Sequence, residues 1–298
     1  MTQKKFMELL TRELSSYFSE EDYEIESNMF LKINGIKRPG IVIRKIGEPV
    51  APTVYVDHFY ADYCKNKCTI EEIAAQFQQV VYSFDATHNA YQSFSVEWEE
   101  CREKIIYRLI SKEKNTIYLS HLPHLPFLNL AIIFVIVHNL SDQGLESVCV
   151  TNELQKKWNI STKELYTLAS QNTPRLFPPR INTMTQTLAH FFGEESACLE
   201  NAKEASDIYI ISNQYGINGS SSLLYEGYIQ QIAEEKENNF YILPSSIHEI
   251  LLFPETSPDI LPNLSQMVKE INKNHVQEDE ILSDQAYYYD REKKSFFM

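Results

Sequence analysis

The sequence predicts an α+β protein with an N-terminal helix, whose sheets are mixed or antiparallel and are built from β-hairpins followed by helices. Two observations predict this fold class. Short runs rich in β-branched and aromatic residues are bounded by Gly, Pro, Asn and Asp, as expected for strands joined by turns. Between these runs, apolar residues recur every three to four positions, which is typical of amphipathic helices.

Helices are predicted from this periodicity and from start signals. Residues 3–18 place apolar side chains on one face. Capping boxes open two further helices, at Thr69–Glu72 and at Ser161–Glu164, because a hydroxyl and a carboxylate there can satisfy the first backbone N–H groups. We expect the second of these helices to end at residue 171, since three prolines follow in 172–179. Other helices are predicted at 59–63, 95–111, 152–158, 228–233 and 264–271.

Strands are predicted at 29–33, 41–44, 52–56, 116–119, 127–137, 147–150, 208–212, 221–225, 240–243 and 250–253. The run 127–137 is almost wholly apolar, which favours a central strand that is buried on both faces. Asn34-Gly35 and Asn218-Gly219 are hairpin turn signals. Residues 121–126 read as a connector broken by proline, and the acidic segment 193–206 reads as a linker or a loose helix.

The chain has 298 residues, enough for one large domain or two ordinary ones. We predict an N-terminal portion over 1–115, made of a helix, a hairpin and further helices. A C-terminal α+β portion follows over 116–298. It is expected to contain two β-β-α-like units, at 130–158 and 207–234, which share a pattern but no residue-level identity.

Charge and composition exclude several function classes. The net charge is −14, which disfavours direct non-specific binding to nucleic acid or to anionic membranes. With only 8 glycines and no phosphate-cradling loop, the sequence predicts no nucleotide cofactor, and no cofactor of any kind is assigned. The longest apolar run, 130–137, is far short of the roughly 20 residues that span a bilayer. We expect a cytoplasmic protein without a signal peptide.

Metal binding is not predicted. Cys64 and Cys68 are spaced C-x3-C, but no second Cys/His pair follows at the spacing of a zinc site. His121 and His124 flank a proline and have no acidic residue close by. The chain has five scattered cysteines, and Cys64 and Cys68 are expected to be two free thiols in a reducing cytosol.

The strongest chemical signal is a polar cluster between two apolar runs, made of Ser245, Ser246, His248 and Glu249. Left unbonded in the interior, such groups cost about 1–3 kcal/mol each. A serine hydrolase needs these residue types, but chain neighbours rarely converge as a triad, and no G-x-S-x-G elbow is present. We favour a structural role, in which the serines cap a turn and the other two satisfy backbone groups or each other. Catalysis by these four residues remains the alternative.

Three further groups are candidate binding residues. Asn213 and Asn218 surround a predicted turn, where they can line a polar pocket or supply turn chemistry. Arg175 can clamp an anion or bond the last carbonyls of its helix.

The third group lies in the C-terminal segment and consists of Asp284, Tyr287, Tyr289 and Asp290. Tyrosines with flanking acids can form a binding edge for a partner. They can equally form a strand that closes the sheet, because tyrosine is a favoured strand residue.

Taken together, the segments 34–45, 51–56, 164–176, 240–250 and 282–290 resemble a bacterial family of unknown function. The clearest marks are Pro-Ser-Ser-Ile-His-Glu at 244–249 and the Ser-Asp…Tyr-x-Tyr-Asp pattern at 283–290. The resemblance covers nearly the whole chain. It implies a cytosolic α+β protein from anaerobic gut-type Firmicutes, often encoded near mobile genetic elements. It implies no activity, cofactor or catalytic residue.

The leading functional hypothesis is a non-enzymatic binding or regulatory factor with a protein partner, in one form an accessory protein of a mobile genetic element. One alternative is a small-molecule hydrolase or transferase that uses the Ser/His/Glu cluster. Another is an acidic mimic of nucleic acid. An enzyme predicts His248 partly exposed beside a carboxylate and a hydroxyl. A binding protein predicts His248 buried with its hydrogen bonds made. The oligomeric state is not predicted.

Overall fold

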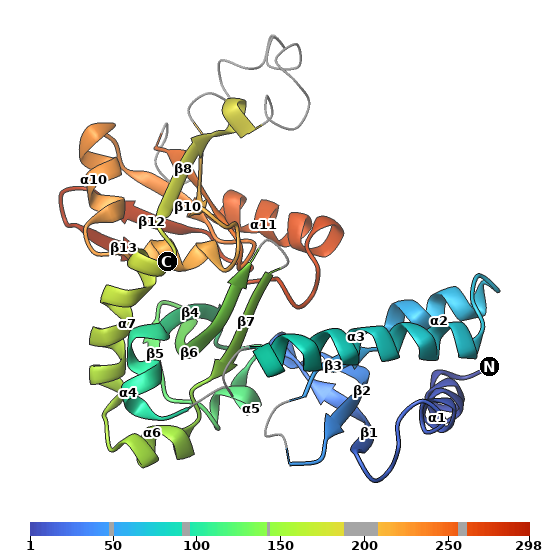
Figure 1. Cartoon of the computed structure of the whole chain (residues 1–298). Coiled ribbons are helices and arrows are strands. Elements are labelled where there is room, and N and C mark those ends of the chain that lie inside the picture. Colours follow the sequence, from blue (N-terminus) through green and yellow to red (C-terminus); the bar gives the residue numbers. More distant parts are fainter. Residues whose placement is uncertain (48–50, 91–95, 142–143, 188–207, 256–260) are drawn as a thin grey trace. The chain divides into compact units, whose positions relative to one another are not determined.

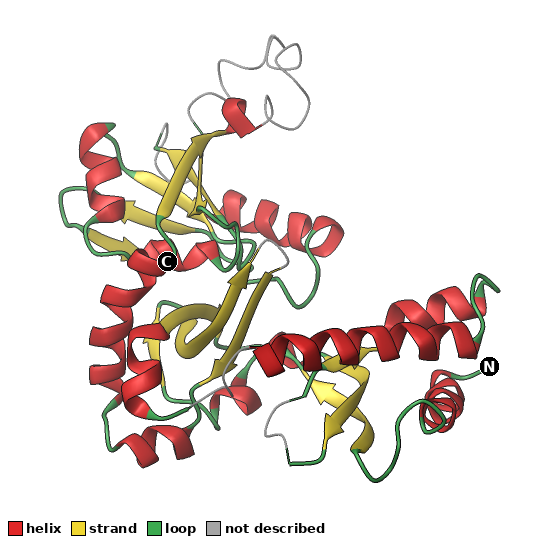
Figure 2. Ribbon diagram, viewed as in Figure 1, coloured by secondary structure: helices red, strands yellow, loops and turns green. Residues whose placement is uncertain are grey.

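The chain forms two compact units (Figure 1, Figure 2). The computed structural model describes residues 1–47, 51–90, 96–141, 144–187, 208–255 and 261–298. Unit 1 comprises Met1–Lys32 and Ile36–Ser95, and unit 2 comprises Ile33–Gly35 and Val96–Met298. All strand pairs in both units are antiparallel among the described residues, so the predicted α+β class is confirmed. The predicted division at residue 115 stays a prediction about domains, and segment 193–206 lies outside the described residues.

Unit 1 contains a three-stranded sheet of order β1-β2-β3. Its elements are α1 (Gln3–Leu14), β1 (Tyr23–Leu31), β2 (Lys37–Lys45), β3 (Thr53–Tyr55), α2 (Asp57–Cys64) and α3 (Ile70–Ala90). The three helices lie where the sequence predicts them. Strand β1, however, starts well before the predicted residue 29. Its first half was not predicted, because Ile25 is the only apolar residue between Glu24 and Asn28 and the alternation of apolar and polar residues is therefore weak.

The core of unit 1 lies between its helices and one face of the sheet. Phe6, Leu10 and Leu14 of α1 are fully buried, as their spacing predicts. They pack with Phe77 of α3 and Ile41 of β2 in one apolar cluster. Burying a large apolar side chain stabilises the fold by about 1.5–3 kcal/mol, so this cluster fixes α1 and α3 on the sheet.

The turn between β1 and β2 belongs to unit 2. Asn34 and Gly35 both have positive φ, 64° and 71°, which is why an Asn-Gly pair suits this tight turn. The Asn34 amide donates hydrogen bonds to the carbonyls of Glu278 and Ile281, at 2.8 and 2.7 Å. The 3₁₀ segment η1 (Ile33–Gly35) is thus anchored by its own side chain.

The first sheet of unit 2 is built around a long central strand, β6 (Leu130–Ser141). It pairs with β4 (Ile105–Ser111), β5 (His124–Phe127) and β7 (Gly144–Cys149). Residues 130–137 are all buried, which confirms the predicted central strand over these residues. Its predicted start at 127 is wrong, because Phe127 ends β5 and pairs with Leu130 across a turn. The surrounding helical elements are α4 (Trp98–Cys101), η2 (Arg102–Lys104), α5 (Thr116–Leu119), α6 (Asn152–Trp158) and α7 (Thr162–Leu176).

Three local predictions for this region are wrong. The predicted helix over 95–111 is a short helix followed by β4. Six of the seven β4 residues are buried, and a strand buried on both faces lacks the two-residue alternation of apolar and polar residues that would identify it. The predicted strand at 116–119 is helix α5. The predicted connector at 121–126 contains the start of β5, which pairs with β6.

Helix α7 covers the outer edge of β4 (Figure 1). Thr173 Oγ1 accepts a hydrogen bond from the Tyr107 backbone N–H at 3.1 Å, and Asn172 Nδ2 donates to the Ile105 carbonyl at 3.0 Å. These contacts explain why the helix runs through Pro174 to Leu176, although the sequence predicted its end at 171. Anchoring on β4 offsets the single helical hydrogen bond that a proline in the last turn removes.

The second sheet of unit 2 has six strands in the order β13-β12-β10-β11-β9-β8. Its strands are β8 (Pro179–Thr183), β9 (Tyr209–Asn213), β10 (Phe240–Leu243), β11 (Ile250–Pro254), β12 (Tyr287–Asp290) and β13 (Ser295–Phe297). The helical segments are η4 (Gly219–Leu224), α10 (Tyr228–Glu235) and α11 (Leu261–His275). Among the described residues, no helix is both long and apolar enough to cross a membrane.

The predicted return strand at 221–225 is wrong, because this segment is mostly the 3₁₀ helix η4. Asn218 does have the positive φ of a turn residue, 51°, but it leads into a helix and not into a hairpin. Three consecutive serines favour local side-chain bonds to the backbone over a strand ladder. Of the two predicted β-β-α units, 130–158 therefore has this order and 207–234 does not.

Thr173→Val tests the covering of β4. The substitution keeps the shape of the side chain but leaves the buried Tyr107 N–H unpaired, so the free energy of unfolding is expected to fall by about 1–3 kcal/mol. Thr173→Ser keeps the hydroxyl and should lose less. Denaturant unfolding measures both variants, and a Val variant as stable as the Ser variant would contradict the assignment.

Candidate functional site

The segment from Pro244 to Glu249 connects β10 to β11, and its backbone is hydrogen-bonded on two sides. On one side, Ile247 N–H donates to the Glu280 carbonyl at 2.9 Å, and Leu282 N–H donates to the Ser245 carbonyl at 3.0 Å. On the other side, Ser220 donates to the Ile247 carbonyl through both its N–H, at 3.2 Å, and its hydroxyl, at 2.8 Å. The connection therefore joins residues near 280 to the start of η4.

The imidazole of His248 lies between a backbone turn and a carboxylate. Nδ1 is 3.4 Å from the Asn218 backbone N and 3.2 Å from the Gly216 carbonyl O. Nε2 is 3.6 Å from Glu280 Oε1, and the His248 side chain is 35% exposed. If Asn218 N–H donates to Nδ1, the ring proton is on Nε2 and faces the carboxylate.

The ring contacts backbone groups, as one of the two predicted structural roles requires, but the predicted partner Glu249 is wrong. Glu249 is exposed and makes no hydrogen bond to another described residue, whereas Glu280 supplies the carboxylate. The Ser246 hydroxyl accepts a hydrogen bond from the His248 backbone N–H at 3.1 Å, as in a turn. Among the described contacts, neither Ser245 nor Ser246 bonds the ring. A Ser/His/Glu arrangement of chain neighbours is therefore not formed among the described residues. The Glu280 carboxylate lies near the ring, but at 3.6 Å it is beyond hydrogen-bond distance.

Gly219 lies where two segments approach most closely. Ser212 Oγ donates to the His248 carbonyl at 2.7 Å, and a Cβ at Gly219 would overlap both of these groups. Asn213 is buried beside them, and its Nδ2 donates to the Ile217 carbonyl at 2.7 Å. Asn213 thus holds the turn that carries Asn218, which is the turn chemistry that the sequence left open.

Arg175 bonds the backbone next to the β4 edge. Its Nη2 donates to the Glu103 carbonyl at 2.7 Å and lies 3.6 Å from the Glu103 carboxylate. It also donates to Asn172 Oδ1 at 3.1 Å. Among the described contacts, the guanidinium therefore bonds one backbone carbonyl, in a neighbouring segment, and none of the carbonyls at the end of its own helix.

The C-terminal tyrosines form strand β12, which lies between β10 and β13. Tyr287 and Tyr289 are buried, and burial raises the pKa of both phenols. Tyr288 is half-buried, and burial together with the Glu255 carboxylate raises its pKa to about 12. The strand left open by the sequence is present, and these phenols stay neutral at physiological pH.

The two acids of this segment both have partners. Asp284 Oδ1 accepts from Asn272 Nδ2 at 2.7 Å, and its Oδ2 lies 3.9 Å from Lys114 Nζ. Asp290 lies 2.8 Å from Lys293 Nζ, and the hydrogen bond from Lys293 lowers the pKa of the Asp290 carboxyl. Among the described residues, no group of three His, Cys, Asp or Glu side chains could hold a metal ion.

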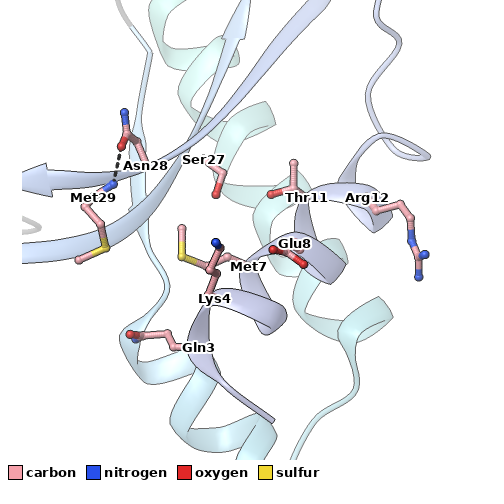
Figure 3. Close-up of a pocket in the computed structure, with 9 residues that line it drawn as sticks. All are labelled: Gln3, Lys4, Met7, Glu8, Thr11, Arg12, Ser27, Asn28 and Met29. Atoms are coloured by element: carbon pink, nitrogen blue, oxygen red, sulfur yellow. Dashed lines mark hydrogen bonds between the residues drawn. The ribbon is translucent and has the colours of Figure 1, made fainter.

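A second candidate site, in unit 1, was not predicted from the sequence. It is a groove of about 770 Å³ between α1 and β1, which we call the α1–β1 groove (Figure 3). Its lining residues are Gln3, Lys4, Met7, Glu8, Thr11, Arg12, Ser27, Asn28 and Met29. The only sequence signal was that Ser27 and Met29 continue the alternation of Tyr23 and Ile25, which face the core.

The groove is lined in part by adaptable apolar side chains. Figure 3 shows Met7 directed from α1 toward the strand that carries Ser27 and Met29, and Met29 is 50% exposed. The Thr11 hydroxyl has no hydrogen-bond partner in the described part of the chain. Methionine fills irregular gaps and suits surfaces that accept varied partners. The groove thus has the lining of a binding site.

Three exposed charges of α1 line the groove. Lys4 and Arg12 have no acidic partner among the described residues, whereas Glu8 pairs with Lys5 at 3.1 Å. The unpaired charges of the groove are therefore positive, on a chain whose net charge is −14.

A protein-family model matches residues 3–291. The chain belongs to DUF5688, a family of unknown function. No curated protein and no solved structure matches it. Membership confirms the predicted resemblance to a family of unknown function over nearly the whole chain. It assigns no role to any residue of this DUF5688 protein, so the function is argued from the two sites.

Gly219→Ala tests the close approach at η4. The added methyl group collides with Ser212 and the His248 carbonyl, and overpacking of this kind costs about 1–3 kcal/mol, so the melting temperature should fall. Gly216→Asn is the control, because its side chain meets open space and asparagine tolerates a φ of +66°. Equal melting temperatures for the two variants would show that the predicted contact is absent.

Proposed function

We propose that this protein is a non-enzymatic binding factor that takes a protein partner into the α1–β1 groove. The observation that carries the proposal is the groove itself, a space of about 770 Å³ that adjoins a strand edge to which no other described strand is paired. Its volume is within the range of ordinary ligand sites. Its lining offers apolar contacts and unpaired polar groups together.

The polar cluster at 245–249 supports a structural role. Its backbone joins two other segments, and Ser212, Ser220 and Ser246 each direct a hydroxyl to backbone atoms of Ile247 or His248. Buried hydroxyls used in this way satisfy the backbone, as most polar groups in protein interiors do. No hydroxyl that could act as a nucleophile bonds the His248 ring among the described contacts.

One observation favours the hydrolase or transferase alternative. The His248 ring is partly exposed, and the Glu280 carboxylate lies 3.6 Å from Nε2, close enough to orient the ring after a small side-chain movement. In this alternative the nucleophile is a water molecule for a hydrolase, or a hydroxyl or amine of the acceptor substrate for a transferase. This alternative requires that His248→Ala abolish a measurable turnover without a fall in melting temperature. The structural role requires the reverse.

The proposed setting is the cytoplasm of a bacterium, where the protein would serve as an accessory factor of a mobile genetic element. This part of the proposal is supported by the sequence resemblance and by the acidic composition. The partner bound in the groove is expected to be another protein of that system.

Photo-crosslinking tests the groove as the partner site. A photoreactive amino acid replaces Met29 in the groove or, as a control, Ile117, which is 70% exposed in unit 2. In the native host, position 29 should give a discrete crosslinked product that Met7→Gln weakens, because Met7 supplies apolar contact. Position 117 should give none. The same products at both positions, or none at position 29, would contradict the proposal.

A further inference from the structure

We propose that the occupant of the α1–β1 groove is an extended segment of a partner protein that adds as a strand to the free edge of β1. The segment carries an apolar residue and an acidic residue two positions apart. The apolar side chain enters the groove between Met7 and Met29, and the acidic one meets Lys4 or Arg12. This inference rests on the proposed function of the groove and specifies the chemistry of its partner.

The backbone orientation of β1 is fixed by hydrogen bonds at its two ends. Lys32 N–H donates to the Ile36 carbonyl at 2.7 Å, and Ile46 N–H donates to the Asp22 carbonyl at 2.8 Å. The backbone N–H and C=O groups of even-numbered β1 residues therefore point toward β2. Along an antiparallel strand, the backbone groups of successive residues point to opposite sides. The N–H and C=O groups of Ser27 and Met29 point to the opposite side, where no described strand pairs with β1.

The outer edge of β1 is accessible, and the Asn28 side chain bonds one of its backbone N–H groups. The side chains of residues 26–29 are all exposed. Asn28 Oδ1 accepts a hydrogen bond from the Met29 backbone N–H at 2.8 Å (Figure 3). An unpaired edge is a template for an added strand, and proteins commonly block it until a specific partner binds. The Asn28 amide occupies the position that a partner carbonyl would take.

The groove lies on the face where the side chains of an added strand would point. Ser27 and Met29 project toward α1, and residues directly opposite them on an added strand project the same way. A side chain there meets Met7 and Met29. Two residues along the added strand, the next side chain points to this same face.

The positive charges of α1 favour an acidic residue at that next position of the added strand. Lys4 is in the first turn of α1 and Arg12 in its last turn, so a cation without an acidic partner among the described residues lies near each end of the groove. Complementary charge across an interface adds specificity and speeds association. A basic segment would instead meet two like charges.

A second copy of the chain fits this pattern poorly. Pairing of two β1 edges would place Glu24 and Glu26 on the face opposite Lys4 and Arg12, since they alternate with Ile25. Ile25 itself already packs in the core of its own unit. We therefore assign the groove to a different protein, and dimerisation becomes an outcome of the test.

The test uses a phage-displayed library of random nonapeptides, selected on the full-length protein. The enriched peptides are synthesised with a fluorescent label, and their affinities are measured by anisotropy. We expect an apolar and an acidic residue two positions apart. N-methylation of alternate backbone amides should abolish binding for one set of amides and spare the other, because only one set faces β1.

Three variants refine the test. Lys4→Glu combined with Arg12→Glu should weaken binding about ten-fold, whereas Lys65→Glu, an exposed lysine outside the groove, should not. Asn28→Ala should tighten binding about five-fold. In this variant the partner no longer has to displace the Asn28 side chain before it accepts a hydrogen bond from the Met29 N–H. If the Asn28 side chain instead contacts the bound peptide directly, the same variant should bind more weakly.

Each outcome decides between the two proposals. Peptides that depend on Lys4 and Arg12 but tolerate N-methylation of both sets would overturn strand addition and leave the groove as a binding site. Failure to select peptides, or peptides insensitive to the groove variants, would overturn both. A dimer in light scattering that the peptides dissociate would make a second copy the occupant and contradict the assignment to another protein.

Discussion

Every backbone N–H and C=O group at the margin of a sheet or connection needs a hydrogen-bond partner, and this requirement accounts for both candidate sites. In unit 2 the partners come from within the chain. Thr173 and Asn172 cover the β4 edge, and Ser212 and Ser220 bond the carbonyls of the β10–β11 connection. In unit 1, among the residues that the structure describes, the outer edge of β1 receives one such partner, the Asn28 side chain. The difference between the units is thus a difference in how backbone groups are satisfied.

Part of this architecture could be predicted from sequence because its signals are local. Phe6, Leu10 and Leu14 at helical spacing, the two capping boxes, and the apolar run that became β6 each carry their own evidence within a few residues. The failures have a common origin in tertiary contacts. Helix α7 continues through Pro174 because its side chains are anchored on β4, which the sequence of the helix alone cannot reveal.

The site residues show the same limit. Ser245, Ser246, His248 and Glu249 were grouped because they are adjacent in the chain, but the acid opposite the His248 ring is Glu280. A hydroxyl that bonds the backbone and one that attacks a substrate look identical in sequence. The α1–β1 groove was missed for a related reason. Its strand half reads as a polar stretch, and exposure of Met29 becomes visible only once α1 and β1 are placed together.

Residue-resolved amide hydrogen exchange, measured by NMR on the free protein, tests this account most directly. If the outer edge of β1 is open, the Ser27 amide should exchange much faster than the Glu26 amide beside it, which bonds to β2, while the covered Tyr107 amide should exchange slowly. Equal protection of Ser27 and Glu26 would show that another segment or molecule already pairs with this edge. The central claim that β1 is free for a partner would then be wrong.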